Sequence, residues 1–259
     1  MTASSAECPV FDAWATGECD AGAKRLPFRA MTSVPIAEEL LLLVYDNESG
    51  KATGSRIGLD LGMAAAVLVE LALAGRVAYA DGNIVVADAT PTGVPVADEV
   101  LAKIEANVPL SPAVWVQRLR HRLRDRVLSD LISRGVIRDV DEVEQEFIHV
   151  HRYPSVDASV ENETRARLAA ALAGEGAPDE RTAALATLIV AARMEAALGL
   201  SGEAAATAHQ RLERIASGAG FSGGVDLEQS TVRPSVALVV IALGKAIQAA
   251  LGTPRPVTH

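Results

Sequence analysis

The feature that most constrains the fold is an apolar run from Leu61 to Gly75 that is interrupted only by Glu70. A helix over residues 59–74 would be apolar almost all round, so in a soluble protein it must lie inside a bundle. The run is shorter than the roughly 20 apolar residues that a membrane-spanning helix needs. A second run, Ser235 to Gly252, is interrupted by Lys245. We therefore expect a buried core helix and no transmembrane segment.

Composition favours helices elsewhere too, because aromatic residues make up only 3% of the chain while alanine, leucine and valine are abundant. We predict a mainly α fold, a helical bundle with one or two short β-hairpins. Asp81-Gly82-Asn83 is typical of a hairpin turn within residues 76–87. The other predicted elements are a second hairpin over 136–153 with a polar tip at 141–146, and helices over 35–47, 96–106, 112–134, 157–173, 178–198, 203–217 and 234–251.

Residues 1–32 lack a hydrophobic period, and we interpret them as a disordered tail before a single domain over residues 33–259. Met1 and Met31 are both candidates for the native start. Cys8 and Cys19 lie in this tail and indicate neither a disulfide framework nor a metal site. The tail is acidic and has no apolar segment, so it does not resemble a secretory signal. We expect no cofactor and no metal.

The charge is unevenly distributed. The chain carries a formal charge of −9, which argues against general nucleic-acid binding. Residues 113–138 nevertheless hold seven arginines against two aspartates, and only four of the 24 basic residues in the chain are lysine. The preference for arginine suggests a bacterial, cytoplasmic protein. The arginine cluster indicates one surface that meets anions.

Four features resemble catalytic or metal sites. Residues 218–223 and 220–224 match the dinucleotide and hydrolase glycine patterns, but each mechanism needs a preceding strand, and here a helix is predicted. His149 and His151 would share one face of a strand, which we interpret as a polar hairpin face, because two histidines do not make a metal site. Glu70 is better explained by a structural ion pair with Arg76 than by general acid catalysis. We therefore predict no enzyme.

The arginine-rich helix is the strongest candidate for function. On a continuous helix Arg118, Arg122 and Arg126 fall on one flank of the apolar stripe, and Arg120 and Arg124 on the other. Most would be solvated charges paired with acids. A few placed together beside a cleft would bind phosphate, because the planar guanidinium suits bidentate contact. As exposed flank residues, each would contribute under about 1 kcal/mol to folding.

The chain resembles the Golgi phosphoprotein 3 family, and is identified as a bacterial member. The resemblance extends over residues 36–251, and Glu70-Leu-Ala-Leu-Ala-Gly-Arg76 is its most specific part. The segments that carry it are Ile36–Val44, Leu61–Val77, Pro91–Gly93 with Asp98 and Glu99, Arg124–Ile137 and Arg181–Met194.

This resemblance implies a hydrophobic helical core ringed by amphipathic helices, with a β-hairpin that projects toward a membrane. It also implies binding of phosphatidylinositol 4-phosphate, and recruitment of Golgi enzymes in eukaryotic members. The family's headgroup tryptophan and arginine of the second helix align with Ser55 and Ala64. Its later arginine pair aligns with His121 and Arg124, beside Arg120 and Arg126. The membrane-contact hairpin would use Phe147, Ile148 and Val150.

Two functional hypotheses follow. The first is peripheral binding of an anionic phospholipid or phosphoinositide headgroup through Arg120, His121, Arg124 and Arg126, on the inner face of the cytoplasmic membrane. The alternative is a cytoplasmic adaptor that uses the same arginines to bind an acidic protein partner. Arginines that line a concave basin beside the hairpin would favour the first, and arginines paired with acids of neighbouring helices would favour the second.

Overall fold

The structure is a computed structural model that describes residues 34–144, 148–174, 177–200, 202–218 and 232–252. Within these ranges the chain forms eight α-helices, one 3-10 turn and two separate β-hairpins, so the mainly α prediction is confirmed. The helices are α1 (Ile36–Val44), α2 (Arg56–Leu73), α3 (Pro95–Glu105), α4 (Pro112–Ser133), α5 (Ser159–Ala173), α6 (Glu180–Ala191), α7 (Gly202–Gly218) and α8 (Pro234–Gly252), with the 3-10 turn η1 at Glu195–Leu198. The hairpins are β1 (Val77–Ala80) with β2 (Asn83–Val86), and β3 (Val140–Glu144) with β4 (Ile148–Arg152).

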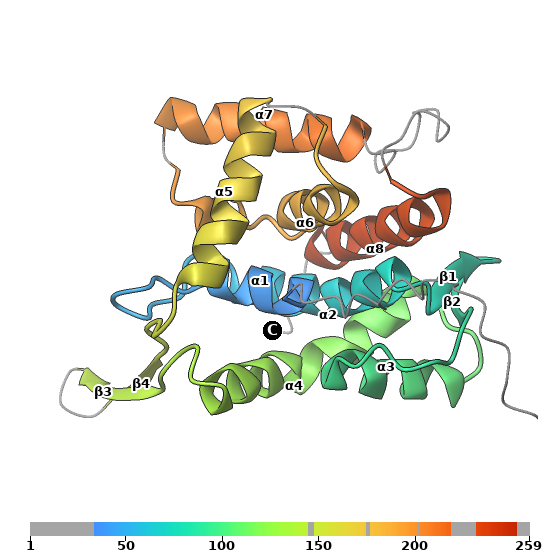
Figure 1. The fold of residues 1–259 in the computed structure, drawn as a ribbon, viewed down its shortest axis with the longest axis horizontal. Coiled ribbons are helices and arrows are strands. Elements are labelled where there is room, and N and C mark those ends of the chain that lie inside the picture. The colour runs from blue at the N-terminus through green and yellow to red at the C-terminus, as the bar shows by residue number, and fades with distance from the viewer. Residues whose placement is uncertain (1–33, 145–147, 175–176, 201, 219–231, 253–259) are drawn as a thin grey trace, which may run out of the picture. The chain divides into compact units, whose positions relative to one another are not determined.

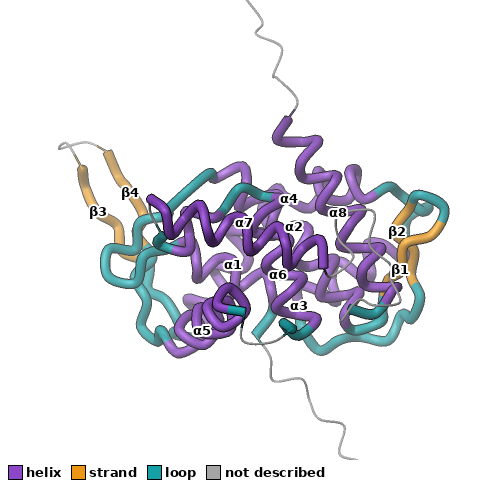
Figure 2. Tube along the Cα trace, turned by 90° about the horizontal axis from the view of Figure 1, so that it is seen from above, coloured by secondary structure: helices purple, strands orange, loops and turns teal. Residues whose placement is uncertain are grey.

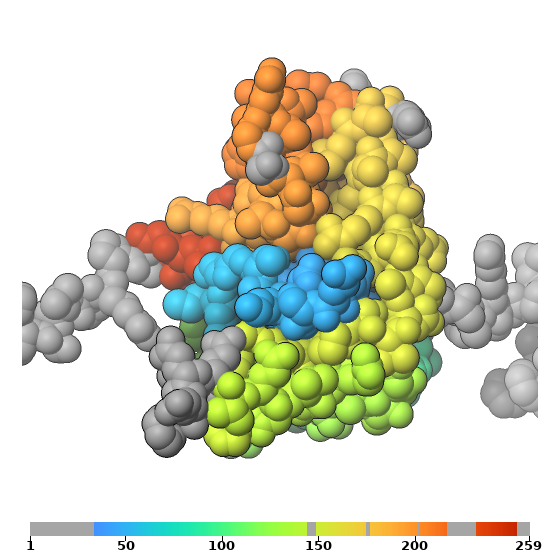
Figure 3. Space-filling model, turned by 90° about the vertical axis from the view of Figure 1, so that its left-hand side faces the viewer, coloured from blue at the N-terminus to red at the C-terminus, as the bar shows by residue number. Residues whose placement is uncertain are grey.

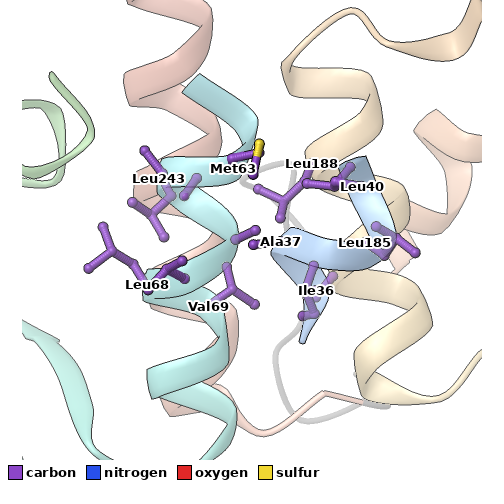
Figure 4. Close-up of a cluster of buried hydrophobic side chains, with 14 of the residues drawn as sticks. Ile36, Ala37, Leu40, Met63, Leu68, Val69, Leu185, Leu188 and Leu243 are labelled. Carbon is purple, nitrogen blue, oxygen red and sulfur yellow. The ribbon is translucent and has the colours of Figure 1, made fainter. Parts of the chain in front are cut away.

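The helices α1 and α2 form the centre of this fold. In Figure 1 they lie between α6 and α8 on one side and α3 and α4 on the other, and α2 contacts all four of those helices. Every residue of α1 is buried, and fourteen of the eighteen residues of α2 are buried. Figure 4 shows Ile36, Ala37 and Leu40 of α1 among apolar side chains of α2, α6 and α8. The predicted all-round apolar core helix is therefore present.

The helix boundaries differ from the prediction at both ends of the first loop. The α1 helix ends at Val44, before the predicted 47, because Tyr45 and Ala52 form an isolated β-bridge that turns the chain back. The α2 helix begins at Arg56 instead of Leu59, because Ser55 caps it by accepting a hydrogen bond from the N–H of Gly58 at 3.2 Å. The loop between the two helices, residues 45–55, is therefore held by its own hydrogen bonds.

Two carboxylates of α1 lie in the core because arginines from other helices reach them. Glu39 accepts a hydrogen bond from Arg167 of α5 at 2.7 Å and a longer one from Arg181 of α6 at 3.4 Å. Glu38 accepts one from Arg134, the residue after α4, at 2.5 Å. Burial raises the pKa of Glu38 and of Glu39 above the usual carboxyl range, although these arginines act to lower both pKa values. Their ion pairs therefore only partly offset the cost of desolvation.

Glu70 occupies the centre of this buried charge network. Its carboxylate accepts hydrogen bonds from the backbone N–H of Ile36 at 2.9 Å and from both terminal nitrogens of Arg181 at 3.0 and 3.1 Å. The predicted ion pair of Glu70 was right in kind but wrong in partner, because Arg76 binds Asp88 instead. Arg181 also donates to the carbonyl of Val34. Glu70 and Arg181 thus hold the start of α1 against α2 and α6.

The two hairpins lie at opposite ends of the helices in Figure 2. The first agrees with its prediction, with Ala80 and Asn83 flanking the Asp81-Gly82 turn. The second begins later than predicted: residues 136–139 precede the sheet, and the acidic segment expected at its tip forms β3, in which Asp141 pairs with His151. Each of the two histidines of β4 contacts an aspartate, His149 with Asp141 and His151 with Asp139.

One helix of the described residues, α8, is long and apolar enough to cross a membrane by length and composition. Here it serves as a core helix, since it contacts α2, α4 and α6. Its side chains at Val236, Val239, Val240, Leu243 and Ile247 are fully buried.

The arginine-rich helix α4 is broken in the middle. His121 has an extended backbone (φ −78°, ψ 129°), and Arg122 has a left-handed one (φ 69°, ψ −10°). The prediction of one continuous helix is therefore wrong, but its grouping of Arg118, Arg122 and Arg126 holds, because all three line one hollow between α3 and α4. Residues on either side of the break follow two helical segments, and the bend between them can be followed in Figure 1.

Candidate functional site

The α1–α2 loop is folded tightly against the base of the second hairpin. Asp46 accepts hydrogen bonds from the N–H and hydroxyl of Ser49 at 2.8 and 2.6 Å, which lower the pKa of its carboxyl. Gly50 has φ +63°, and a Cβ there would collide with the backbone of Tyr153 and Pro154. Its carbonyl accepts a hydrogen bond from the N–H of Tyr153 at 3.1 Å. Glycine at this position lets the loop approach the strand backbone.

This close approach creates a basin of about 540 Å³, which we call the hairpin basin. Its walls are the α1–α2 loop, the N-terminus of α2, the second segment of α4 and strand β4. The lining residues are Val44, Tyr45, Lys51–Arg56, Leu59, Arg124, Leu128 and His149–Tyr153. Figure 3 shows this end of the molecule, where the α1–α2 loop in blue lies next to the yellow-green hairpin segments and α5 in yellow.

The hairpin basin is lined by positive charge. Four of its lining residues, Lys51, Arg56, Arg124 and Arg152, are cationic, and none of the described residues that line it is an aspartate or glutamate. Within the described residues, Lys51 and Arg56 form no ion pair, whereas Arg152 lies 3.3 Å from Glu142. The N-terminus of α2 also opens at the basin, where the helix dipole favours anions.

Arg124 is the most enclosed of these cations, with 14% of its side chain exposed. It lies 3.2 Å from Asp125 and 3.7 Å from Asp60 of α2. Its Nε is buried and has no hydrogen-bond partner among the described residues. The expectation of an exposed helix-flank arginine is therefore wrong. Arg124 is a largely enclosed cation in the wall of the basin.

The histidines of β4 add a titratable element to the lining. His149 contacts Asp141 at 2.9 Å and His151 contacts Asp139 at 2.8 Å. The hydrogen bond and charge of Asp139 raise the pKa of His151 above 6.5. Burial raises the pKa of the nearby phenols Tyr45 and Tyr153 above their ordinary value. No cluster of three or more possible metal ligands occurs within the described ranges.

The three arginines and one histidine predicted for the headgroup site do not converge. Arg124 lines the hairpin basin, but His121 and Arg126 line a different hollow between α3 and α4. Arg120 is half-buried before the break in α4 and lines neither. Arg126 also lies 3.5 Å from Glu99 of α3. Arg124 and Arg126 both follow the break at residues 121–122, but they are two residues apart on one helical segment and therefore point to different hollows.

Only some of the residues that the family resemblance predicted for the headgroup site and the membrane contact line the hairpin basin. Ser55 and Arg124, aligned with two headgroup residues of the family, both line the hairpin basin. Ala64 is fully buried in α2, among core side chains. Of the predicted membrane-contact residues, Val150 lines the basin and Ile148 begins β4, and Phe147 lies outside the described residues. The two glycine patterns near Ser222 also fall outside them, apart from Gly218 at the end of α7.

Sequence reasoning missed Lys51, Arg56 and Arg152. Arg56 directly follows Ser55, the position aligned with the headgroup tryptophan, and that neighbourhood was the available signal. Lys51 and Arg152 come from segments about 100 residues apart, so no local pattern joins them.

A comparison with models of known protein families gave a match that covers the helical core. A family model described as Golgi phosphoprotein 3 (GPP34) matches residues 36–250. The chain belongs to the Golgi phosphoprotein 3 family. The matched region begins at the first residue of α1 and ends within α8, so it includes every described helix and both hairpins. A comparison with curated proteins found no match.

Proposed function

We propose that this member of the Golgi phosphoprotein 3 family binds the headgroup of an anionic phospholipid, of phosphoinositide type, in the hairpin basin. The observation that carries the proposal is the lining: four cations and no carboxylate among its described residues, in a chain of net charge −9. In this proposal the chain is a binding protein rather than an enzyme, and it acts at the cytoplasmic face of a membrane.

Apolar side chains beside the cations suit a membrane interface. Ile57 follows Arg56 at the N-terminus of α2 and is 49% exposed, and Val143 of β3 is 56% exposed. Binding at an interface combines such apolar contacts with attraction to anionic lipid. Each basic residue near an anionic surface contributes about 1 kcal/mol, so four of them support reversible binding without anchoring.

Arg124 provides the first test of the site. We expect Arg124→Gln to weaken binding to anionic vesicles about fivefold, the effect of about 1 kcal/mol. The same change should cost about 1–2 kcal/mol of unfolding free energy, because Asp60 loses its partner. Vesicle flotation and urea unfolding measure the two effects separately.

Arg120→Gln is the matched control, because Arg120 is half-buried on the same helix and lines neither hollow. Equal losses of flotation in both variants would contradict the assignment to the hairpin basin. The adaptor hypothesis predicts two other results: the unaltered chain floats to the same extent with and without anionic lipid, and pull-downs recover an acidic protein partner.

The histidines predict a pH dependence. Because Asp139 raises the pKa of His151, its imidazolium persists to higher pH than that of a free histidine. Lowering the pH from about 8 to about 6 protonates His151 and adds positive charge to the basin, so anionic-vesicle binding should strengthen. The gain should shrink in His151→Gln. A pH profile that this substitution leaves unchanged would exclude His151 as the responsible group.

A further inference from the structure

The hollow between α3 and α4, which we call the α3–α4 basin, is the second cationic cavity of the described residues, with a volume of about 480 Å³. Lys103 of α3 and Arg118, Arg122 and Arg126 of α4 contribute four cations, with His121 beside them. Two carboxylates, Glu99 and Asp125, also line it. The positive charge of this basin therefore exceeds the negative charge by two.

Both carboxylates are paired with cations, Glu99 with two cations of this basin and Asp125 with Arg124 of the other basin. Glu99 binds Lys103 at 2.8 Å and lies 3.5 Å from Arg126. Asp125 lies 3.2 Å from Arg124, which lines the other basin. Arg118 donates to the side chain of Asn107 at 3.3 Å and stands over the ring of Trp115. Among the described residues, Arg122 has no acidic partner.

The backbone at Arg122 is an independent anomaly. Its φ of +69° lies in the left-handed region, which costs free energy for any residue with a Cβ and which glycine adopts freely. A helix break of this kind could be formed at lower cost by glycine or asparagine. Backbone strain that a sequence retains at a polar hollow is a reason to look for function there.

The break also alters the electrostatics of the hollow. A new helical segment starts after Arg122, and Leu123 and Asp125 of its first turn line the basin. The N–H groups that begin a helical segment carry the positive end of its dipole, which favours an anion. The surplus of cations in the cavity and the start of this helical segment therefore both favour binding of an anion.

We propose that the α3–α4 basin is a second anion site, separate from the hairpin basin, which binds a phosphate monoester through Arg122, Arg126 and Lys103. Arginine contacts a phosphate group with two parallel hydrogen bonds, and lysine adds a point charge. The same chemistry could come from a lipid headgroup or from a soluble phosphate, and the experiment below separates these sources.

The decisive variant is Arg122→Gly, which removes the cation and relieves the backbone strain together. Arg193→Gly is its matched control: Arg193 is exposed, also has a positive φ, of 56°, and lines neither basin. Both substitutions should leave the melting temperature unchanged or raised. Only Arg122→Gly should weaken phosphate binding, by about tenfold or more.

The titration uses inorganic phosphate and the full chain carrying Lys51→Glu and Arg56→Glu, which reverses two charges of the hairpin basin. Amide resonances of residues 121–126 should shift with phosphate in this background and in its Arg193→Gly derivative, but not in its Arg122→Gly derivative. Absence of phosphate-induced shifts at residues 121–126, or equal shifts in both derivatives, would overturn the proposal. Because two charges of the hairpin basin are reversed in this background, the titration reports on the α3–α4 basin. A negative result here would therefore leave the lipid proposal for the hairpin basin untouched.

A vesicle arm identifies the source of the phosphate. In the chain with an intact hairpin basin, Arg122→Gly should reduce flotation on vesicles that contain a phosphomonoester lipid and should leave flotation on phosphodiester anionic lipid unchanged. That pattern assigns the site to a headgroup. Arg122→Gly and Arg193→Gly could instead float equally on each of the two kinds of vesicle, while Arg122→Gly still fails to bind phosphate in the titration. That result assigns the α3–α4 basin to a soluble phosphate.

Discussion

Substituting Glu70 with alanine will lower the free energy of unfolding by about 3–5 kcal/mol, the cost of removing one partner from a buried ion pair. Glu70 is 7% exposed and accepts three hydrogen bonds, two from Arg181 and one from the N–H of Ile36. Without it, Arg181 retains only the longer contact to Glu39 and the carbonyl of Val34. The N–H of Ile36, at the start of α1, also loses its hydrogen-bond acceptor on α2.

Urea unfolding followed by circular dichroism measures this loss. The control is Glu99→Ala, because Glu99 and Lys103 form an exposed pair within one helix, for which about 0.5 kcal/mol is expected. If Glu70→Ala does not fold, Glu70→Gln keeps the shape of the side chain and should still be less stable than the unaltered chain. Equal midpoints for Glu70→Ala and Glu99→Ala would show that the buried network does not hold the core together.

The double substitution Lys51→Glu and Arg56→Glu will have the largest effect on membrane binding. It replaces two of the four cations of the hairpin basin with anions, a change of four charges. At about 1 kcal/mol per charge, binding to anionic vesicles should fall by up to about a thousandfold. Both residues lack ion pairs within the described residues, and Arg56 is exposed. Stability should therefore change little.

The matched control is Arg214→Glu with Lys245→Glu, which makes the same change in net charge on α7 and α8, at exposed positions outside both basins. If the attraction depended only on the net charge of the protein, both double variants would lose binding equally. Loss confined to Lys51→Glu with Arg56→Glu, at unchanged melting temperature, is the result that our account requires.

The helical core could be predicted from the sequence because its signals are local. The all-round apolar α2, the glycine after it and the Asp81-Gly82 turn each determine their own conformation through adjacent residues. The break in α4 could not be predicted this way. Leu119 and Leu123 keep helical spacing across it, and both are buried, so the apolar pattern of a continuous helix persists although the backbone leaves it.

Contacts between residues far apart in the sequence were also missed, because no local pattern joins them. Arg76 is close to Glu70 in sequence, but Arg181, 111 residues away, is the arginine that reaches it in the core. The hairpin basin depends in the same way on Gly50 and Tyr153, which bring two distant segments together. The predicted headgroup site placed Arg126 beside Arg124, whereas residues two apart on one helical segment point to different sides, so Arg124 lines one basin and Arg126 the other.

The central claim is that the hairpin basin binds anionic lipid, and vesicle flotation of the unaltered full chain tests it most directly. The chain should float with vesicles that contain anionic phospholipid and stay in the lower fraction with neutral vesicles. The floating fraction should fall as salt rises, because added ions screen the four cations. Equal recovery with neutral and anionic vesicles at low salt would contradict the account.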